Sequence, residues 1–198
     1  MLSIVHGVPF SPDGEYLTTG CNPTAQILGT KTGAKTWFGV PCCILADGSR
    51  ELTDYRSVLP HETKSNAEDM YIRGVCFGPD GKLLATGAED GIVRVCSTSF
   101  TPRDKKIHTT FYGHTRMTCA LTSSPDRMLV DSASGNCTAR IRDMPNGSLR
   151  TLAIANDIYD GFTNVAFSSN GRLVATDSID KVHQFSDSSS DLLQIPLP

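Results

Sequence analysis

The sequence predicts an all-β protein assembled from repeated units of short antiparallel strands. The clearest unit spans residues 75–95 and reads VCFGPDGKLLATGAEDGIVRV, with apolar runs separated by turns at Pro79–Gly81 and Glu89–Gly91. Proline presets φ and glycine accepts positive φ in the first turn, and Asp-Gly is a hairpin signal in the second. A single meander of this kind cannot bury both of its faces, so the chain should contain further copies.

Copies of the unit occur along the whole chain. Residues 8–20 (VPFSPDGEYLTTG) and 165–176 (VAFSSNGRLVAT) match it closely, and residues 121–130 form a degenerate copy. The spacing of the later copies is about 45 residues, within the period of WD40 propeller blades. Gly113-His114 also precedes the third copy where such blades carry a Gly-His pair. The pattern therefore predicts a partial WD40 β-propeller.

We predict about four blades, of which the third and fourth are degenerate. Their expected boundaries are 1–50, 70–112, 113–156 and 157–198, with a polar connecting insert at 51–69. The strands expected in the first blade are Ile4–Phe10, Tyr16–Thr19, Ala25–Leu28 and Thr36–Val40. The fourth strand of the second blade is expected at Ile107–Phe111.

Composition excludes several classes of function. The net charge of −3 argues against direct binding of nucleic acid through phosphate neutralisation. No apolar run approaches the roughly 18–20 residues of a membrane span, so we expect an intracellular protein with no membrane partner. The seven cysteines include no Cys-x-x-Cys pair and the histidines lack ligand spacing, so neither a metal site nor a cofactor is expected.

The signature Trp-Asp pair of WD40 blades is replaced in each later copy. Cys96-Ser97, Arg142-Asp143 and Phe185-Ser186 stand at its expected place. A buried polar network normally accompanies that pair. We expect its remaining members to be His114, Ser132 and Asn136 in the third blade and Asp90 in the second.

The first two units resemble one family in particular. Gly14–Leu17 with Thr19–Asn22, and Met70–Phe77 with Ala85–Asp90, are similar to the first two blades of the fungal Tup-family general corepressors, relatives of the animal Groucho proteins. The resemblance implies a nuclear protein that binds DNA-binding repressors, and possible further partners are histone tails or histone deacetylase complexes. Family propellers have seven blades. An arc of about four should therefore stay open, with edge strands that favour self-association.

The resemblance also implies a docking rim. The start of the first strand and the end of the second strand of a blade share one edge, where the family docks its repressors. The positions that match are Cys21, Tyr71 and Glu89. Gly74 stands on this rim where the family usually has serine, and Asn22 is the first-blade counterpart of Glu89. The alternative is that Cys21 and Tyr71 are packing residues without a partner.

Two possible catalytic features have simpler explanations. Residues 29–36 (GTKTGAKT) nearly match a phosphate-binding loop, but a strand-like segment follows in place of the helix that such a loop requires. We therefore expect a hairpin turn there. His114 lies near Asp126 and Asp131 in the sequence, but no nucleophile motif accompanies it. We expect no enzyme. The interaction scaffold is the leading hypothesis, and a truncated, purely structural remnant is its alternative.

Overall fold

The protein folds entirely into antiparallel β-sheets over the part that can be described. The computed structural model describes residues 7–21, 24–33, 35–39, 71–98, 107–126, 129–144, 147–154, 161–178, 183–187 and 195–196. These residues form four sheets. None of the described segments is a helix that could cross a membrane. The predicted all-β class is confirmed.

Each sheet is a meander in which every strand pairs with the next along the chain. Sheet 1 consists of β1 (Tyr16–Cys21), β2 (Thr24–Gly29) and β3 (Lys35–Gly39). Sheet 2 consists of β4 (Ile72–Phe77), β5 (Leu83–Ala88), β6 (Val93–Ser97) and β7 (Ile107–Phe111). Sheet 3 consists of β8 (Thr118–Ser123), β9 (Leu129–Ser134), β10 (Thr138–Asp143) and β11 (Leu149–Ile154). Sheet 4 consists of β12 (Phe162–Phe167), β13 (Leu173–Ser178), β14 (His183–Asp187) and β15 (Ile195–Pro196).

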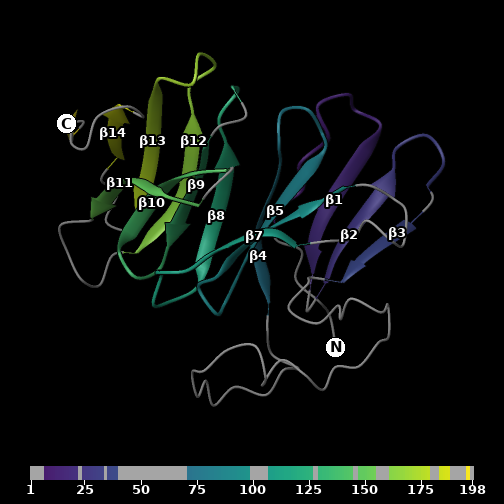
Figure 1. Ribbon diagram of the computed structural model, residues 1–198, viewed down its shortest axis with the longest axis horizontal. Coiled ribbons are helices and arrows are strands. Elements are labelled where there is room, and N and C mark those ends of the chain that lie inside the picture. The colour runs from purple at the N-terminus through teal and green to yellow at the C-terminus, as the bar shows by residue number, and fades with distance from the viewer. Residues whose placement is uncertain are drawn as a thin grey trace.

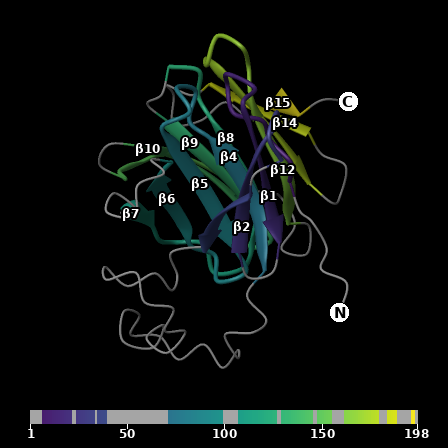
Figure 2. The same ribbon diagram turned by 90° about the vertical axis from the view of Figure 1, so that its right-hand side faces the viewer.

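The sheets stand side by side in chain order (Figure 1), with sheets 1 and 4 at opposite ends. Figure 2 shows the same arrangement with sheet 1 nearest the viewer. The first strands of sheets 2, 3 and 4 are neighbours, because β4 contacts β8 and β8 contacts β12. No strand of sheet 1 pairs with one of sheet 4 among the described residues. The arrangement is that of an open, partial propeller.

Sheet 1 differs from the prediction at its first strand. Residues 1–6 lie outside the described part, and residues 7–9 are not in a strand. A single bridge joins Phe10 to Leu17, at the place where Phe77 pairs with Leu84 in sheet 2. Three strands are therefore described here in place of the four expected. The segment also lacks cover, since Phe10 is 63% exposed whereas Phe77 is 7% exposed.

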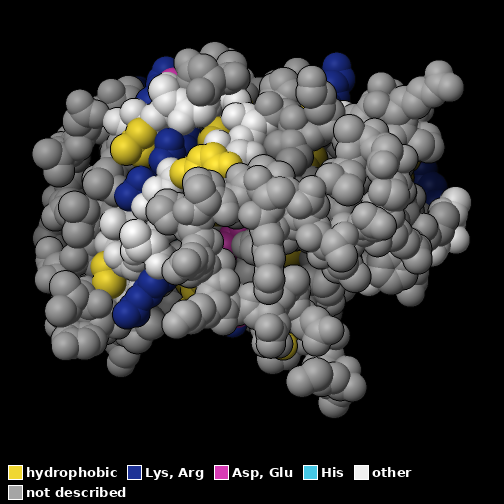
Figure 3. Space-filling model, turned by 60° about the horizontal axis from the view of Figure 1, so that its bottom comes forward, with side chains coloured by type: hydrophobic (Ala, Val, Ile, Leu, Met, Phe, Trp, Pro, Cys, Tyr) yellow, Lys and Arg dark blue, Asp and Glu magenta, His cyan; other side chains and the backbone are white. Residues whose placement is uncertain are grey.

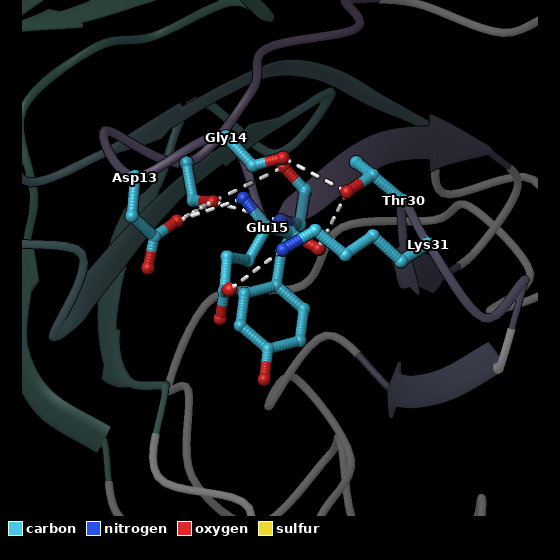
Figure 4. A network of polar contacts seen from close by, with 7 residues as sticks. Asp13, Gly14, Glu15, Thr30 and Lys31 are labelled. Carbon is cyan, nitrogen blue, oxygen red and sulfur yellow. Dashed lines mark hydrogen bonds and ion pairs between the residues drawn. The ribbon is translucent and has the colours of Figure 1, made fainter.

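The turn before β1 shows why these hairpins form (Figure 4). Asp13 Oδ1 accepts hydrogen bonds from the Ser11 hydroxyl at 2.5 Å and from the Glu15 amide at 3.0 Å. The Ser11 hydroxyl accepts a bond from the Tyr16 amide at 2.9 Å. Gly14 adopts a φ of +69°, which a side chain would strain. Local side-chain bonds of this kind favour a turn over extended chain.

Apolar side chains fill the spaces between neighbouring sheets. Successive side chains of a strand point to opposite faces of its sheet, so alternate residues pack against the sheets on either side. In β5, Leu84 packs toward Ile27 of sheet 1, whereas Ala85 packs toward Leu121 of sheet 3. At the free face of sheet 4 this cover is missing, and Leu173 is 47% exposed.

Strand register corrects one position read from the sequence. Leu84 pairs with Cys96 and Val130 pairs with Arg142, the two places expected for the signature tryptophan. The equivalent pair in sheet 4 is Val174 with Ser186. Ser186 therefore takes this place, and Phe185 does not. The sequence alignment of this strand with those of sheets 2 and 3 was shifted by one residue. In a strand, such a shift moves a side chain to the other face of the sheet.

Candidate functional site

Tyr71 and Glu89 meet at one edge of sheet 2. Tyr71 comes directly before β4, and Glu89 comes directly after β5. The Glu89 amide donates a hydrogen bond to the Tyr71 carbonyl at 3.1 Å. Both residues are partly exposed. The meander thus brings together two residues that are separated by a whole hairpin in the sequence.

An ion pair joins Glu89, at this edge, to Arg73 of β4. Arg73 Nε and Nη2 donate to Glu89 Oε1 at 3.0 and 2.5 Å. The two side chains are 31% and 29% exposed. Because both side chains are partly buried, solvent screens the attraction between their charges only in part. Sequence reasoning missed Arg73, because its pairing depends on the β-bulge between Ile72 and Gly74.

Sheet 3 repeats the same edge with other side chains. Met117 precedes β8, and its carbonyl accepts a bond from the Gly135 amide at 3.0 Å, as Tyr71 does from Glu89. Met117 is 37% exposed. Cys119 follows, and burial raises the pKa of its thiol, against smaller opposing effects of the Gly135 backbone and of the Arg73 charge. We call Tyr71, Arg73, Glu89 and Met117 the strand-start rim.

The other residues predicted for this rim are placed differently. Cys21 ends β1, and its side chain and Asn22 lie outside the described part. The end of β1 does lie near the start of β4, since Ala25, which pairs with Gly20, packs with Ile72.

Gly74 is buried at the interface between sheets 2 and 3. A Cβ on Gly74 would lie 3.1 Å from the carbonyl carbon of Ala120. Its role in the structure is to let two inner strands approach closely, and it offers no side chain to a partner.

Sheet 3 holds a histidine-centred network. His114 Nε2 lies 2.8 Å from Ser132 Oγ, and its Nδ1 lies 2.9 Å from Thr138 Oγ1 and 3.3 Å from Asn136 Oδ1. Burial, followed by the charge of Arg140, lowers the pKa of His114 to about 4. The ring is therefore neutral near pH 7 and serves as a hydrogen-bonding group.

Asp90, expected in a blade network, lies in sheet 2 and forms an ion pair there. Its Oδ2 accepts from Arg94 Nη2 at 2.8 Å, and the side chains are only 4% and 6% exposed. Asp90 Oδ1 also accepts from the Ile92 amide at 2.9 Å, which fixes the turn between β5 and β6. The partner Arg94 was not foreseen.

Arg142 occupies the tryptophan place of sheet 3. Its Nη1 donates to the Gly147 carbonyl at 3.0 Å and its Nη2 donates to the Tyr112 carbonyl. Its guanidinium lies 5.8 Å from the centre of the Phe111 ring. The long side chain thus links β10 to the last strand of sheet 2.

The segment that resembles a phosphate-binding loop is a hairpin turn, as expected. It connects β2 with β3, and the Gly33 amide donates to the Gly29 carbonyl at 2.9 Å. Thr30 Oγ1 donates to the carbonyls of Gly14 and Glu15 at 2.9 and 3.0 Å (Figure 4). The hydroxyl is thereby used within the sheet. Among the described residues no group of three or more His, Cys, Asp or Glu side chains is placed to hold a metal ion.

Comparison with known proteins bears on sheet 2 most directly. Residues 59–97 match the profile of the WD domain, G-beta repeat, a span that includes β4, β5 and β6. The chain carries a WD40 repeat. Its sheets are accordingly those of a partial WD40 propeller.

Several relatives are named for repression of transcription. The chain is 40% identical over 112 residues to the transcriptional repressor rco-1 of Neurospora crassa, covering 57% of this chain and 15% of the relative. It is 30% identical over 146 residues to the general transcriptional corepressor TUP1 of Saccharomyces cerevisiae, covering 57% of this chain and 20% of the relative. It is 37% identical over 112 residues to the general transcriptional corepressor tupA of Dictyostelium discoideum, covering 57% and 15%.

The WD40 chain thus spans at most a fifth of these relatives. Similarity extends to a pre-mRNA-processing factor and to a small nucleolar RNA-associated protein. The WD40 repeat and the corepressor relatives support a protein-interaction scaffold, and they confirm the predicted resemblance to Tup-type corepressors.

Proposed function

We propose that this WD40 chain is a scaffold in nuclear transcriptional repression that docks DNA-binding repressors on the strand-start rim. The observation that carries the proposal is the backbone hydrogen bond that brings Tyr71 next to Glu89, whose side chain pairs with Arg73 at the same edge. Partly exposed tyrosines and partly desolvated charged groups are both frequent in interface anchors. The similarity to named corepressors supports the choice of partner.

The rim has features that suit a short amphipathic segment. Tyr71 and Met117 occupy equivalent places on neighbouring sheets, and both offer partly exposed apolar surface. Glu89 uses one carboxylate oxygen for Arg73, which leaves Oε2 as an acceptor in the bonds described. A partner can therefore combine an apolar side chain with a donor. Histone tails, which are rich in donors, and histone deacetylase complexes are further proposed partners.

Binding of fluorescently labelled peptides from the docking segments of DNA-binding repressors tests the proposal. We expect Tyr71→Ala to weaken binding by about tenfold or more, the loss typical of an interface anchor. We expect Glu89→Gln to weaken binding less, and Glu89→Lys to weaken it more because a second cation then faces Arg73. Fluorescence anisotropy measures all three affinities.

Tyr112→Ala is the matched control, since Tyr112 is also a tyrosine that follows a strand and is 54% exposed. Its affinity should equal that of the unchanged chain. Equal affinities in folded Tyr71 and Glu89 variants would move the partner site away from this rim. Failure of the unchanged folded chain to bind any repressor peptide would support the alternative, a purely structural remnant.

A further inference from the structure

Two arginines occupy the same register position in neighbouring sheets but have different surroundings. Arg94 of β6 pairs across the sheet with Thr86, and Arg140 of β10 pairs with Ser132. A turn residue lies four positions before each arginine. It is Asp90 in sheet 2 and Asn136 in sheet 3. Arg94 is neutralised by Asp90 at 2.8 Å. The corresponding residue for Arg140 is Asn136, whose side-chain amide is neutral.

Asn136 is also fully engaged elsewhere. Its Oδ1 accepts bonds from the Thr138 amide at 3.2 Å and the Thr138 hydroxyl at 2.6 Å, and it faces His114. In the described part of the chain, Arg140 has no hydrogen bond or ion pair, and its Nε is buried without a partner. A guanidinium presents five donors in a rigid fork, and those of the two terminal nitrogens, which are not among the buried atoms, remain available here.

A second cation lies beside the first. Arg142 is on the same face of β10, two residues further along. Burial lowers the pKa of Arg140, and burial together with the charge of Arg140 lowers the pKa of Arg142. His114, whose pKa the charges of both arginines help to lower, is neutral near pH 7. The two positive charges thus lack a described counterion.

Exposed backbone at Tyr112 and Gly113 lies against the two arginines. Gly113 has a φ of +132°, and a Cβ there would lie 2.2 Å from Arg140 Nη1 and 3.2 Å from Arg142 Nη2. Glycine is therefore needed for the guanidinium groups to lie against the chain. Tyr112 and Gly113 themselves are exposed. On the face shown in Figure 3, several Lys and Arg side chains lie on the left beside hydrophobic ones, others lie at the upper right and the right edge, and acidic side chains show in small spots.

We propose that Arg140 and Arg142 bind the phosphate of a phosphorylated segment of a partner protein. A phosphate monoester carries close to two negative charges near pH 7 and matches two guanidinium groups, whereas a carboxylate neutralises one. The fork of Arg140 supplies a bidentate contact. The exposed Tyr112 ring offers apolar surface for a residue that flanks the phosphate. None of the four residues of the strand-start rim belongs to this site.

The test uses the whole chain and a fluorescein-labelled peptide library, degenerate except for a central phosphothreonine. Matched libraries carry threonine or glutamate at the centre. We expect the phosphothreonine library to bind at least about tenfold more tightly than either, and inorganic phosphate to displace it. Equal binding of the threonine or the glutamate library would overturn the assignment.

Two variants locate the binding within the chain. Arg140→Gln removes the guanidinium group. Asn136→Asp introduces a carboxylate at the place that Asp90 occupies in sheet 2, so that Arg140 can form an ion pair within its own sheet. Both should lower affinity for the phosphothreonine library by about tenfold. Arg172→Gln, at an exposed arginine of sheet 4, is the control and should change nothing. If Arg140→Gln does not fold, unchanged binding by folded Asn136→Asp still refutes the proposal, as does an equal loss in Arg172→Gln.

Discussion

Sheets 2 and 3 have the same strand order and register, yet they handle buried polar groups in opposite ways. Sheet 2 encloses one compact ion pair, Asp90 with Arg94. Sheet 3 spreads its polar atoms over the His114 network and leaves the Arg140 guanidinium and the Asp131 carboxylate without partners in the described structure. The same backbone arrangement accommodates both the ion pair of sheet 2 and the histidine network of sheet 3. The residue in the turn after the second strand, Asp90 or Asn136, decides whether the arginine has an acidic partner within its own sheet.

The largest expected effect comes from breaking the sheet 2 pair. Asp90→Ala leaves the charge of Arg94 buried, because that side chain is only 6% exposed. Loss of one partner of a buried pair costs about 3–5 kcal/mol of unfolding free energy. Urea unfolding measures the change. The double variant Asp90→Ala with Arg94→Met should recover much of the loss, and an equally unstable double variant would show that the turn, and not the charge, is responsible.

The next effect concerns the unpaired carboxylate of sheet 3. Asp131 is 1% exposed, at the place where sheet 2 has Ala85. Burial raises its pKa from 3.8 to about 7. A folded pKa above the unfolded one means that the carboxyl favours folding fully only below about pH 4, and that this contribution is lost as the pH rises toward 7. At pH 8 the folded protein carries a buried, unpaired charge.

Asp131→Ala should therefore stabilise the protein at pH 8 by about 2–4 kcal/mol and should change little near pH 4. Thermal unfolding followed by circular dichroism at several pH values checks this. His114 acts in the opposite sense below about pH 6.5, because its pKa is lowered to about 4 and its protonation opposes folding. His114 does not contribute between pH 6.5 and pH 8.5, so the variant should be more stable than the parent throughout this range, and equal stability there would contradict the prediction.

The smallest of these effects concerns the contact between the two sheets. A Cβ on Gly87 of β5 would lie 2.6 Å from the Thr118 Cγ2 of β8. Gly87→Ala should cost about 1–3 kcal/mol, as overpacking of a tight interface does. Gly135→Ala is the control, since a Cβ there meets Met117 at an ordinary 3.6 Å. Chemical denaturation that ranks the two variants equally would mean that β8 shifts to make room.

The sequence predicted the repeating frame well because strands and turns leave local signals. Ile107–Phe111 was expected as a strand and is β7. The hairpins at Pro79–Gly81 and Glu89–Gly91 were likewise visible in turn residues. Of the first strand expected at Ile4–Phe10, only residues 7–10 are described; residues 7–9 are not in a strand, and Phe10 is 63% exposed. Local signals do not show what lies across an interface.

The sites were harder to predict for the same reason. The meander argument did place Tyr71 beside Glu89. It could not show that Gly74 is enclosed by Ala120, or that Arg73 reaches Glu89, since both depend on a bulge and on the approach of two sheets. The contrast between Arg94 and Arg140 likewise needed strand register, because the two segments differ by a single turn residue.

The exposed side chains at the two ends of the arc have a consequence for assembly. Sheet 1 leaves Val8 and Phe10 uncovered, and sheet 4 leaves Leu173 uncovered. These are unlike surfaces, so a contact between them is heterologous and cannot close as a symmetric pair. Copies that join in this way would add head to tail, and would form either a ring or a growing filament according to the rotation at each step. Any association of two copies through these surfaces would therefore be head to tail.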